Sequence, residues 1–193
     1  KGGELKITLE NTRKWYEYIS LFSFEDTYVT VYLPTETDVK MDIDVSTGDV
    51  KIPSDIKLSE LKISISTGDV ECFASCAGDI RIKGSTGDVR LSGLSADDVN
   101  IEVTTGQIKL SNVECETLTT MADTGDTKFT EVNVKEITSV KTDTGDVTFT
   151  SGFGAELYVK TSTGDVSFEN FDAREMSIET DTGDVTGTLL TSK

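Results

Sequence analysis

Apolar and polar residues alternate in short runs along this chain, and the runs recur with a period of 19 or 20 residues. A Thr-Gly-Asp or Thr-Gly-Gln triplet closes each period, and its glycine falls at Gly48, Gly68, Gly87, Gly106, Gly125, Gly145, Gly164 and Gly183. β-Branched residues are frequent between the triplets, and helix-length amphipathic segments are missing. This repeat predicts short strands wound into stacked β-coils.

Two apolar positions follow each turn, separated by one polar residue, which is the alternation of a strand with one wet face. The first inward column holds Val50, Val70, Val89, Ile108, Thr127, Val147, Val166 and Val185. The second holds Ile52, Cys72, Leu91, Leu110, Phe129, Phe149, Phe168 and Gly187. Equivalent residues of stacked coils would lie about 4.8 Å apart. We therefore predict a ladder of stacked rings from Phe129, Phe149 and Phe168.

A second alternating strand leads into each turn. Its two inward columns begin with Met41, Leu61 and Ile80 and with Ile43, Ile63 and Ile82. Pairs such as Leu94 with Ala96 indicate a third, short inward segment. The sequence therefore predicts an all-β fold, a single-stranded parallel β-helix or β-solenoid with about 19 to 20 residues and three short sides per coil.

The glycine of each triplet supplies the positive φ of a tight corner, so we interpret the eight glycines as structural turns. Stacking also places one column of aspartates at this corner, namely Asp49, Asp69, Asp88, Asp126, Asp146, Asp165 and Asp184. Adjacent carboxylates repel by roughly 1 kcal/mol in water. Backbone amides, bound Ca²⁺ or nearby cations would relieve this repulsion, the cations being Lys51, Arg90, Lys109 and Lys128. The calcium ladder is the less favoured alternative, because the motif lacks the ligand density of calcium-binding β-rolls.

The triplet Asp-Thr-Gly at Asp123, Asp143 and Asp181 resembles the active-site sequence of aspartic proteases, in which two copies share one proton. Here the copies occur at the repeat spacing. Stacked along one edge, they would not face each other across a cleft, so we expect no protease site.

The composition argues against several classes of partner and of catalytic chemistry. The chain has 35 acidic and 18 basic residues, and its formal charge of -17 disfavours nucleic acid and anionic lipid as partners. Histidine is absent, which excludes an imidazole base and the usual nitrogen ligand of zinc. No apolar run approaches the length of a membrane span, so direct membrane insertion of this fragment is not expected. We expect no enzyme activity, no cofactor and no catalytic metal, because no acid, base and nucleophile converge in the columns.

Three cysteines, Cys72, Cys76 and Cys115, form neither a dense disulfide framework nor a zinc-ligand pattern. Cys72 and Cys115 fall in inward columns, which favours buried packing. A local disulfide between Cys72 and Cys76 is an open alternative.

The two ends depart from the repeat. We interpret residues 1–27 as an N-terminal strand and aromatic cap and residues 28–193 as the solenoid, within one structural domain. The cap would cover the first coil, with an aromatic partner-binding surface as the alternative. Residues 28–34 are predicted as a first strand ending at Pro34. At the other end little covers the last layer, so either the native protein continues or two molecules stack end to end.

An extended strand ending in Leu-Pro, followed by coils closing on "STGDV" or "DTGDV", resembles a family of bacterial adhesin-like proteins, a domain of unknown function on β-solenoids. The resemblance covers roughly residues 28–188. It implies a right-handed β-helix in an extracytoplasmic, cell-envelope location, anchored through a membrane segment upstream of this sequence and linked to envelope stress. It carries over no catalytic residues. Gln107 and Thr127 depart from the family pattern.

Three functions follow from these observations. The first is a non-enzymatic envelope module, an acidic rod that displays a surface such as Lys51, Arg90 and Lys109 to an unidentified protein or glycan, or acts as a spacer. The second is a polysaccharide-acting β-helix enzyme, which is disfavoured because coils of nearly equal length leave no long loops to build a groove. The third is a filament-forming scaffold, against which the aromatic N-terminal segment argues.

Overall fold

The structure is a computed structural model that describes residue 30 and residues 39–189. The chain divides into two units, Lys1–Tyr32 and Leu33–Lys193, and all the described strands belong to the second. Within the described residues every regular element is a β-strand, and no helix there could span a membrane. The predicted all-β fold is confirmed. The predicted cap at 1–27 and, apart from Thr30, the predicted strand at 28–34 lie outside the described residues.

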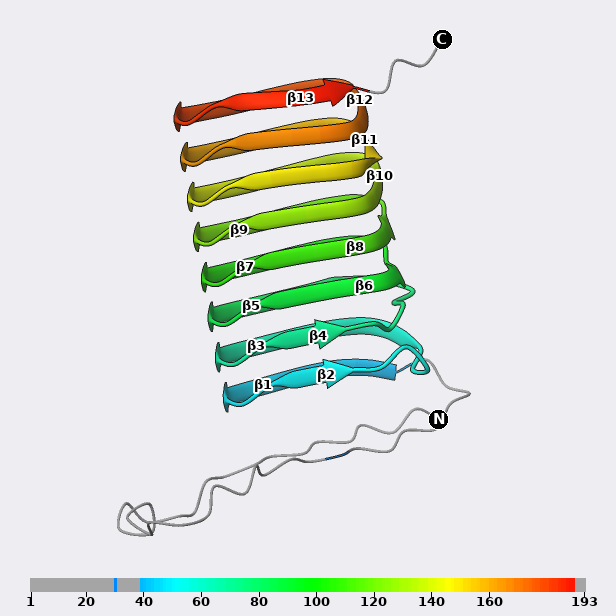
Figure 1. The fold of residues 1–193 in the computed structure, drawn as a ribbon. Helices are drawn as coiled ribbons and strands as arrows, with labels where there is room; N and C mark the ends of the chain where they lie inside the picture. Colours follow the sequence, from blue (N-terminus) through cyan, green and yellow to red (C-terminus); the bar gives the residue numbers. More distant parts are fainter. Residues whose placement is uncertain (1–29, 31–38, 190–193) are drawn as a thin grey trace, which may run out of the picture. The chain divides into compact units, whose positions relative to one another are not determined.

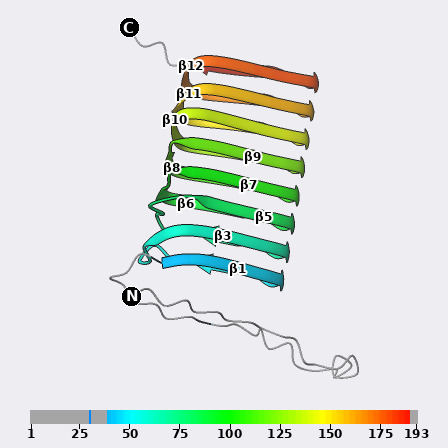
Figure 2. The same ribbon diagram turned by 180° about the vertical axis from the view of Figure 1, so that it is seen from behind.

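The strands form one sheet whose members pair in parallel with their copies in neighbouring coils, so that the coils stack one above another (Figures 1 and 2). They are β1 (Val39–Thr47), β2 (Val50–Ile52), β3 (Leu58–Thr67), β4 (Val70–Cys72), β5 (Ile80–Thr86), β6 (Val89–Ser95), β7 (Asp98–Thr105), β8 (Ile108–Cys115), β9 (Thr117–Thr124), β10 (Thr127–Thr144), β11 (Val147–Thr163), β12 (Val166–Thr182) and β13 (Val185–Leu189). From β10 to β12 one strand spans the whole path between two glycine turns. This arrangement confirms the predicted β-solenoid.

The predicted inward columns superpose in register. The first runs through Val50, Val70, Val89, Ile108, Thr127, Val147, Val166 and Val185. Thr127 is 1% exposed and lies between Ile108 and Val147, so its polar side chain does not disturb the stacking. Val185 is 46% exposed, because no described coil covers it. Within β10, three inward segments confirm the three sides of a coil: 127–129, 132–134 and 138–142.

A second corner separates the first two sides of each later coil, and the sequence pattern did not reveal it. One residue there adopts a positive φ between 51° and 66°, namely Gly93, Asn112, Glu131, Ser151 and Asn170. The strand pairing skips this residue and resumes on the next one, so Leu94 pairs with Val113. A single left-handed residue therefore turns the chain while the register is kept.

The phenylalanine ladder differs from its prediction at the third ring. Phe129 and Phe149 stack with centroids 4.6 Å apart and an interplanar angle of 15°, as predicted. The next ring is that of Phe171, whose centroid lies 4.9 Å from that of Phe149 at 50°. Phe171 fills space beside Gly154, where a β-carbon would lie 3.5 Å from its ring.

The prediction that Phe168 forms the third rung is wrong. Phe168 keeps its place in the column, but it is only half-buried. Its neighbour in the next coil is Gly187, and a β-carbon there would collide with the Phe168 ring. The ring therefore occupies the space that the glycine leaves open, and Phe171 takes its place against Phe149.

Candidate functional site

The turn column explains the repeated triplet. The amide of each turn glycine from Gly48 to Gly164 donates to the threonine carbonyl of the next coil, as from Gly48 to Thr67 at 2.9 Å. A β-carbon on Gly87 would collide with the carbonyl oxygen of Gly68, and φ at Gly87 is +134°. Glycine is therefore required twice, by the left-handed backbone and by the close approach of the coil below. The interpretation of the glycines as structural turns agrees with this geometry.

The aspartate column is an aspartate ladder, in which the carboxylate of one coil accepts the backbone amide of the next. The Asp69 amide donates to Asp49 Oδ1 at 2.9 Å, and the Asp88 amide donates to Asp69 Oδ1 at 2.8 Å. Corresponding bonds reach Gln107, Asp146, Asp165 and Asp184. Backbone amides, the first of the three predicted remedies, therefore stabilise most carboxylates of the column by hydrogen bonding.

The nearby cations contribute less than the amides in the described structure. Lys128 lies 3.3 Å from Asp126, whereas Lys51 and Arg90 both bind Glu71, each at 2.8 Å. No group of three or more His, Cys, Asp or Glu side chains within residues 39–189 is arranged to hold a metal ion. The calcium ladder stays an untested alternative.

The Asp-Thr-Gly copies lie along one edge of the stack. Their threonines belong to a single register column, in which Thr124 pairs with Thr144, and Thr163 separates Thr144 from Thr182. The copies are therefore side by side, as predicted, and do not face one another.

The cysteines occupy the interior. Cys72 is 0%, Cys76 4% and Cys115 2% exposed, and all three are free thiols. Burial raises the pKa of Cys72 to about 11 and that of Cys115 to about 12. Buried packing is confirmed, and the local disulfide between Cys72 and Cys76 is not formed.

The exposed column just after the turns carries the cations predicted to contact a partner. Lys51, Glu71, Arg90 and Lys109 follow one another in register. The hydrogen bond and charge of Lys51, together with Arg90, lower the pKa of Glu71 below its ordinary value. The carboxylate of Glu71 thus interrupts this column. It forms ion pairs with Lys51 and Arg90, two of the three residues predicted to contact a partner.

A second group of cations lies on the strands that lead into the turns, and the sequence analysis did not single it out. We name it the cationic face. It comprises the outward residues of two adjacent columns over six coils: Lys62, Ser64, Arg81, Lys83, Asn100, Glu102, Thr119, Met121, Ser139, Lys141, Tyr158 and Lys160. Five cations and one carboxylate lie on these six coils, and the same two columns continue into Asp42 and Asp44 at one end and Glu179 at the other, so that five cations face four carboxylates over eight coils. The sequence alone could have identified this face, because its residues alternate with those of the inward columns.

Carboxylates within and around the cationic face hold all five of its cations. The nitrogen–oxygen distances range from 2.6 to 3.8 Å, in the pairs Lys62–Asp42, Arg81–Asp79, Lys83–Glu102, Lys141–Asp143 and Lys160–Glu179. All of these side chains are at least partly exposed, and such ion pairs contribute only about 0 to 1 kcal/mol. A ligand anion would therefore displace them at little cost.

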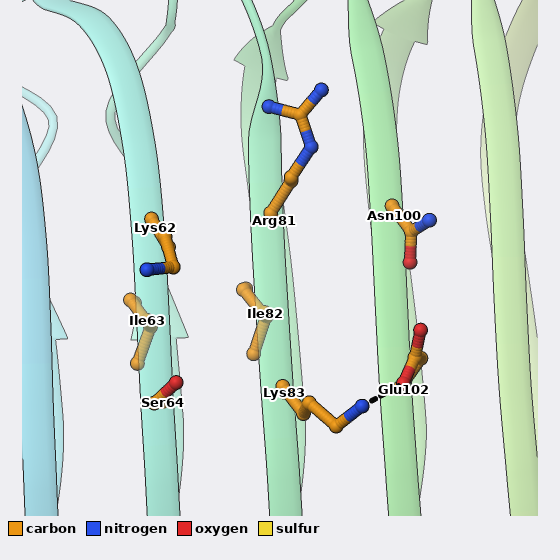
Figure 3. Close-up of a pocket in the computed structure, with 8 residues that line it drawn as sticks. All are labelled: Lys62, Ile63, Ser64, Arg81, Ile82, Lys83, Asn100 and Glu102. Carbon is orange, nitrogen blue, oxygen red and sulfur yellow. Dashed lines mark hydrogen bonds and ion pairs between the residues drawn. The ribbon is translucent and has the colours of Figure 1, made fainter.

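Two shallow hollows lie on this face. The first has a volume of about 180 Å³, and Figure 3 shows Lys62, Arg81 and Asn100 in one row across neighbouring strands, with Lys83 reaching Glu102. The second has a volume of about 280 Å³ and includes Tyr158 and Lys160 among its lining residues. Both are open depressions on a sheet surface.

The comparisons with known proteins address the fold. The family model described as Toastrack DUF4097 matches residues 1–152 and, in a second match, residues 116–193. The chain belongs to this family. Toastrack DUF4097 is a domain of unknown function with a β-solenoid arrangement, which confirms that part of the resemblance noted in the sequence. No curated protein and no solved structure matches the chain.

Proposed function

We propose that this Toastrack chain is a non-enzymatic β-solenoid module of the cell envelope that presents one face to a binding partner. The observation that carries the proposal is the cationic face, on which five exposed cations gather over neighbouring coils of a strongly acidic chain. Randomly scattered surface charge on such a chain would be predominantly acidic. The face is flat apart from its two hollows, which suits binding better than enclosure of a reacting substrate.

The extracytoplasmic, membrane-anchored location and the adhesin-like role extend this proposal. Their support is the resemblance of the "STGDV" and "DTGDV" coils to adhesin-like envelope proteins. An enzymatic alternative finds little support in the site, because the described carboxylates are distributed along columns and do not converge on an enclosed pocket.

Protease treatment of intact cells tests the location. The full-length protein should be digested from outside while a cytoplasmic marker survives, and survival of both would contradict an envelope location. Incubation of the purified chain with soluble polysaccharides tests the absence of catalysis. Release of reducing ends or unsaturated sugars, lost on substitution of a single aspartate, would overturn the non-enzymatic assignment.

End-to-end self-association is a second candidate. Val185 is 46% exposed at one end of the described stack, and a β-carbon on Gly48 at the other end would meet no described atom within 4 Å. Successive coils of two molecules would continue the same parallel pairing. Sedimentation velocity over a micromolar concentration series tests it, and a single species of constant size would exclude it.

A further inference from the structure

The coil interface at the Gly125 turn differs from the others in its buried side chains. β8 and β9 form one side of this interface, and β10 forms the other and pairs with both of them in register (Figure 1). Within residues 39–189 four buried side-chain oxygens have no hydrogen-bond partner, and all four line this interface: those of Thr120, Thr127, Thr138 and Thr142. An unpaired buried hydroxyl destabilises the packing around it, so the interface carries four such penalties.

The residues opposite these threonines cannot satisfy them. The four register pairs across the interface are Ile108–Thr127, Leu118–Thr138, Thr120–Val140 and Ala122–Thr142. In later coils of the Thr142 column the hydroxyls do find partners, because Thr161 donates to the Gly145 carbonyl at 3.4 Å and Thr180 donates to the Gly164 carbonyl at 3.2 Å. The unpaired state is therefore a property of this interface and not of threonine in the column.

The aspartate ladder is broken at the same interface. Asp88 Oδ1 accepts the Gln107 amide at 2.8 Å, and Asp126 Oδ1 accepts the Asp146 amide at 3.1 Å. Gln107 has no carboxylate, and among the described coils the step from Gln107 to Asp126 is the one at which the ladder bond is missing. The interface therefore also lacks one charge-assisted hydrogen bond that its neighbours have.

These deficits are not offset elsewhere in the interface. Each coil of a solenoid contacts only its neighbours, so the stability is approximately a sum of terms for the coils and for the interfaces between them. The interface between β10 and β11 shares three of the unpaired threonines, but there the rings of Phe129 and Phe149 stack and the ladder bond is present. The interface of β10 with β8 and β9 is therefore the weaker one.

We propose that this interface is the opening point of the solenoid, where neighbouring coils separate by local unfolding before any other interior interface of residues 39–189 does. The opening exposes the inward side chains of β8, among them Cys115, whose register partner in β10 is Val134. A rod that acts as a spacer would then lengthen under load at one fixed place. This inference goes beyond the proposed function and does not depend on the identity of a partner.

Thiol labelling of the intact chain tests the proposal, because its three cysteines are free and buried. Iodoacetamide reacts with a thiol only while an opening exposes it, and mass spectrometry of the digested chain gives the rate at each cysteine. We expect Cys115 to react at least about tenfold faster than Cys72 under native conditions. Burial raises the pKa of Cys115 to about 12 and that of Cys72 to about 11, so a more acidic thiol would not explain a faster Cys115.

Two variants should repair the interface in different ways. Thr127→Val replaces an unpaired hydroxyl with a methyl group of similar size. Gln107→Asp gives the Asp126 amide the carboxylate acceptor that other coils provide. Each variant should slow the labelling of Cys115 by about fivefold or more and leave the rate at Cys72 unchanged.

Each variant has a matched control. Thr161→Val removes a buried hydroxyl that already has a partner at another interface. Gln107→Glu adds the same charge as Gln107→Asp on a side chain that is one methylene longer. Both controls should label Cys115 within about twofold of the native rate.

Other results would overturn the inference. Equal rates at Cys72, Cys76 and Cys115 would show that the thiols are exposed by global unfolding alone. Faster labelling of Cys72 or Cys76 would move the weakest interface into the earlier coils. Equal slowing of all three cysteines by the repair variants would show stabilisation of the whole fold and not of one interface. Gln107→Asp changes an exposed residue, so it remains a test even if Thr127→Val does not fold.

Discussion

The coils before Gly125 and the coils after it share one turn motif and one register, yet they fill their interiors differently. The earlier coils pack aliphatic side chains and thiols, such as Leu61, Cys72 and Leu91. The later coils pack the rings of Phe129, Phe149 and Phe171 together with glycines and threonines. Since the register is the same in both, the turns align the coils, and the core residues adapt to the space between them.

The earlier and later coils also differ in the length of their strands. β2 and β4 each contain three residues, whereas β10 contains eighteen. Pro53 follows β2 directly and lacks the amide that its counterpart Phe73 donates back to the Ile52 carbonyl of the preceding coil. In β10, Glu131 takes the left-handed conformation at the corner, and the residues before and after it both pair with β11. The later coils are therefore hydrogen-bonded along more of their length.

The largest effect should come from the aromatic core. Phe149→Ala removes the ring that contacts both Phe129 and Phe171 and should lower the free energy of unfolding by roughly 3 to 5 kcal/mol. Phe168→Ala is the matched control, since its ring is half-buried at the last coils, and it should cost under about 1.5 kcal/mol. Urea unfolding followed by circular dichroism measures both. Equal losses would mean that the aromatic region is not organised around Phe149.

A pair of glycines tests whether the turns set the register. Gly48 and Gly87 have φ values of +129° and +134°, but only at Gly87 would a β-carbon collide with a described coil. Gly48→Ala should cost about 1 to 3 kcal/mol from backbone strain alone. Gly87→Ala should cost about 2 kcal/mol more, because the neighbouring carbonyl must move. Denaturant unfolding of both variants checks the difference, and equal costs would show that stacking at the glycines is unimportant.

The smallest effect concerns the buried threonines of the later coils. Thr142 and Thr161 are register partners, and both are 1% exposed or less. Thr142 Oγ1 has no hydrogen-bond partner, whereas Thr161 Oγ1 donates to the Gly145 carbonyl at 3.4 Å. Thr142→Val should therefore raise the free energy of unfolding by about 1 kcal/mol. Thr161→Val should leave it unchanged or lower it, and the same gain from both would contradict this distinction.

The repeat could be predicted in detail because each copy is a short segment of sequence and the copies follow one another at a nearly constant spacing. The inward position of Val89 follows from its place after Gly87, and its partners Val70 and Ile108 follow from the constant period. By contrast, the corner at Glu131 could not be predicted, because neither glutamate nor its neighbours mark a left-handed residue. Gly93 and Asn112, in the same column, are residue types that tolerate this conformation, and they carried the available signal.

The sequence by itself therefore determined the coil length, the turns and the residues that superpose, because one period applied repeatedly fixes which residue lies above which. Only the tertiary structure decided that Phe171 replaces Phe168 against Phe149, that turn carboxylates such as Asp69 accept the amide of the next coil, and that Lys83 and Lys160 belong to one cationic face. These features depend on distances and side-chain directions between segments brought together by coiling, and a linear pattern of apolar and polar residues does not contain them.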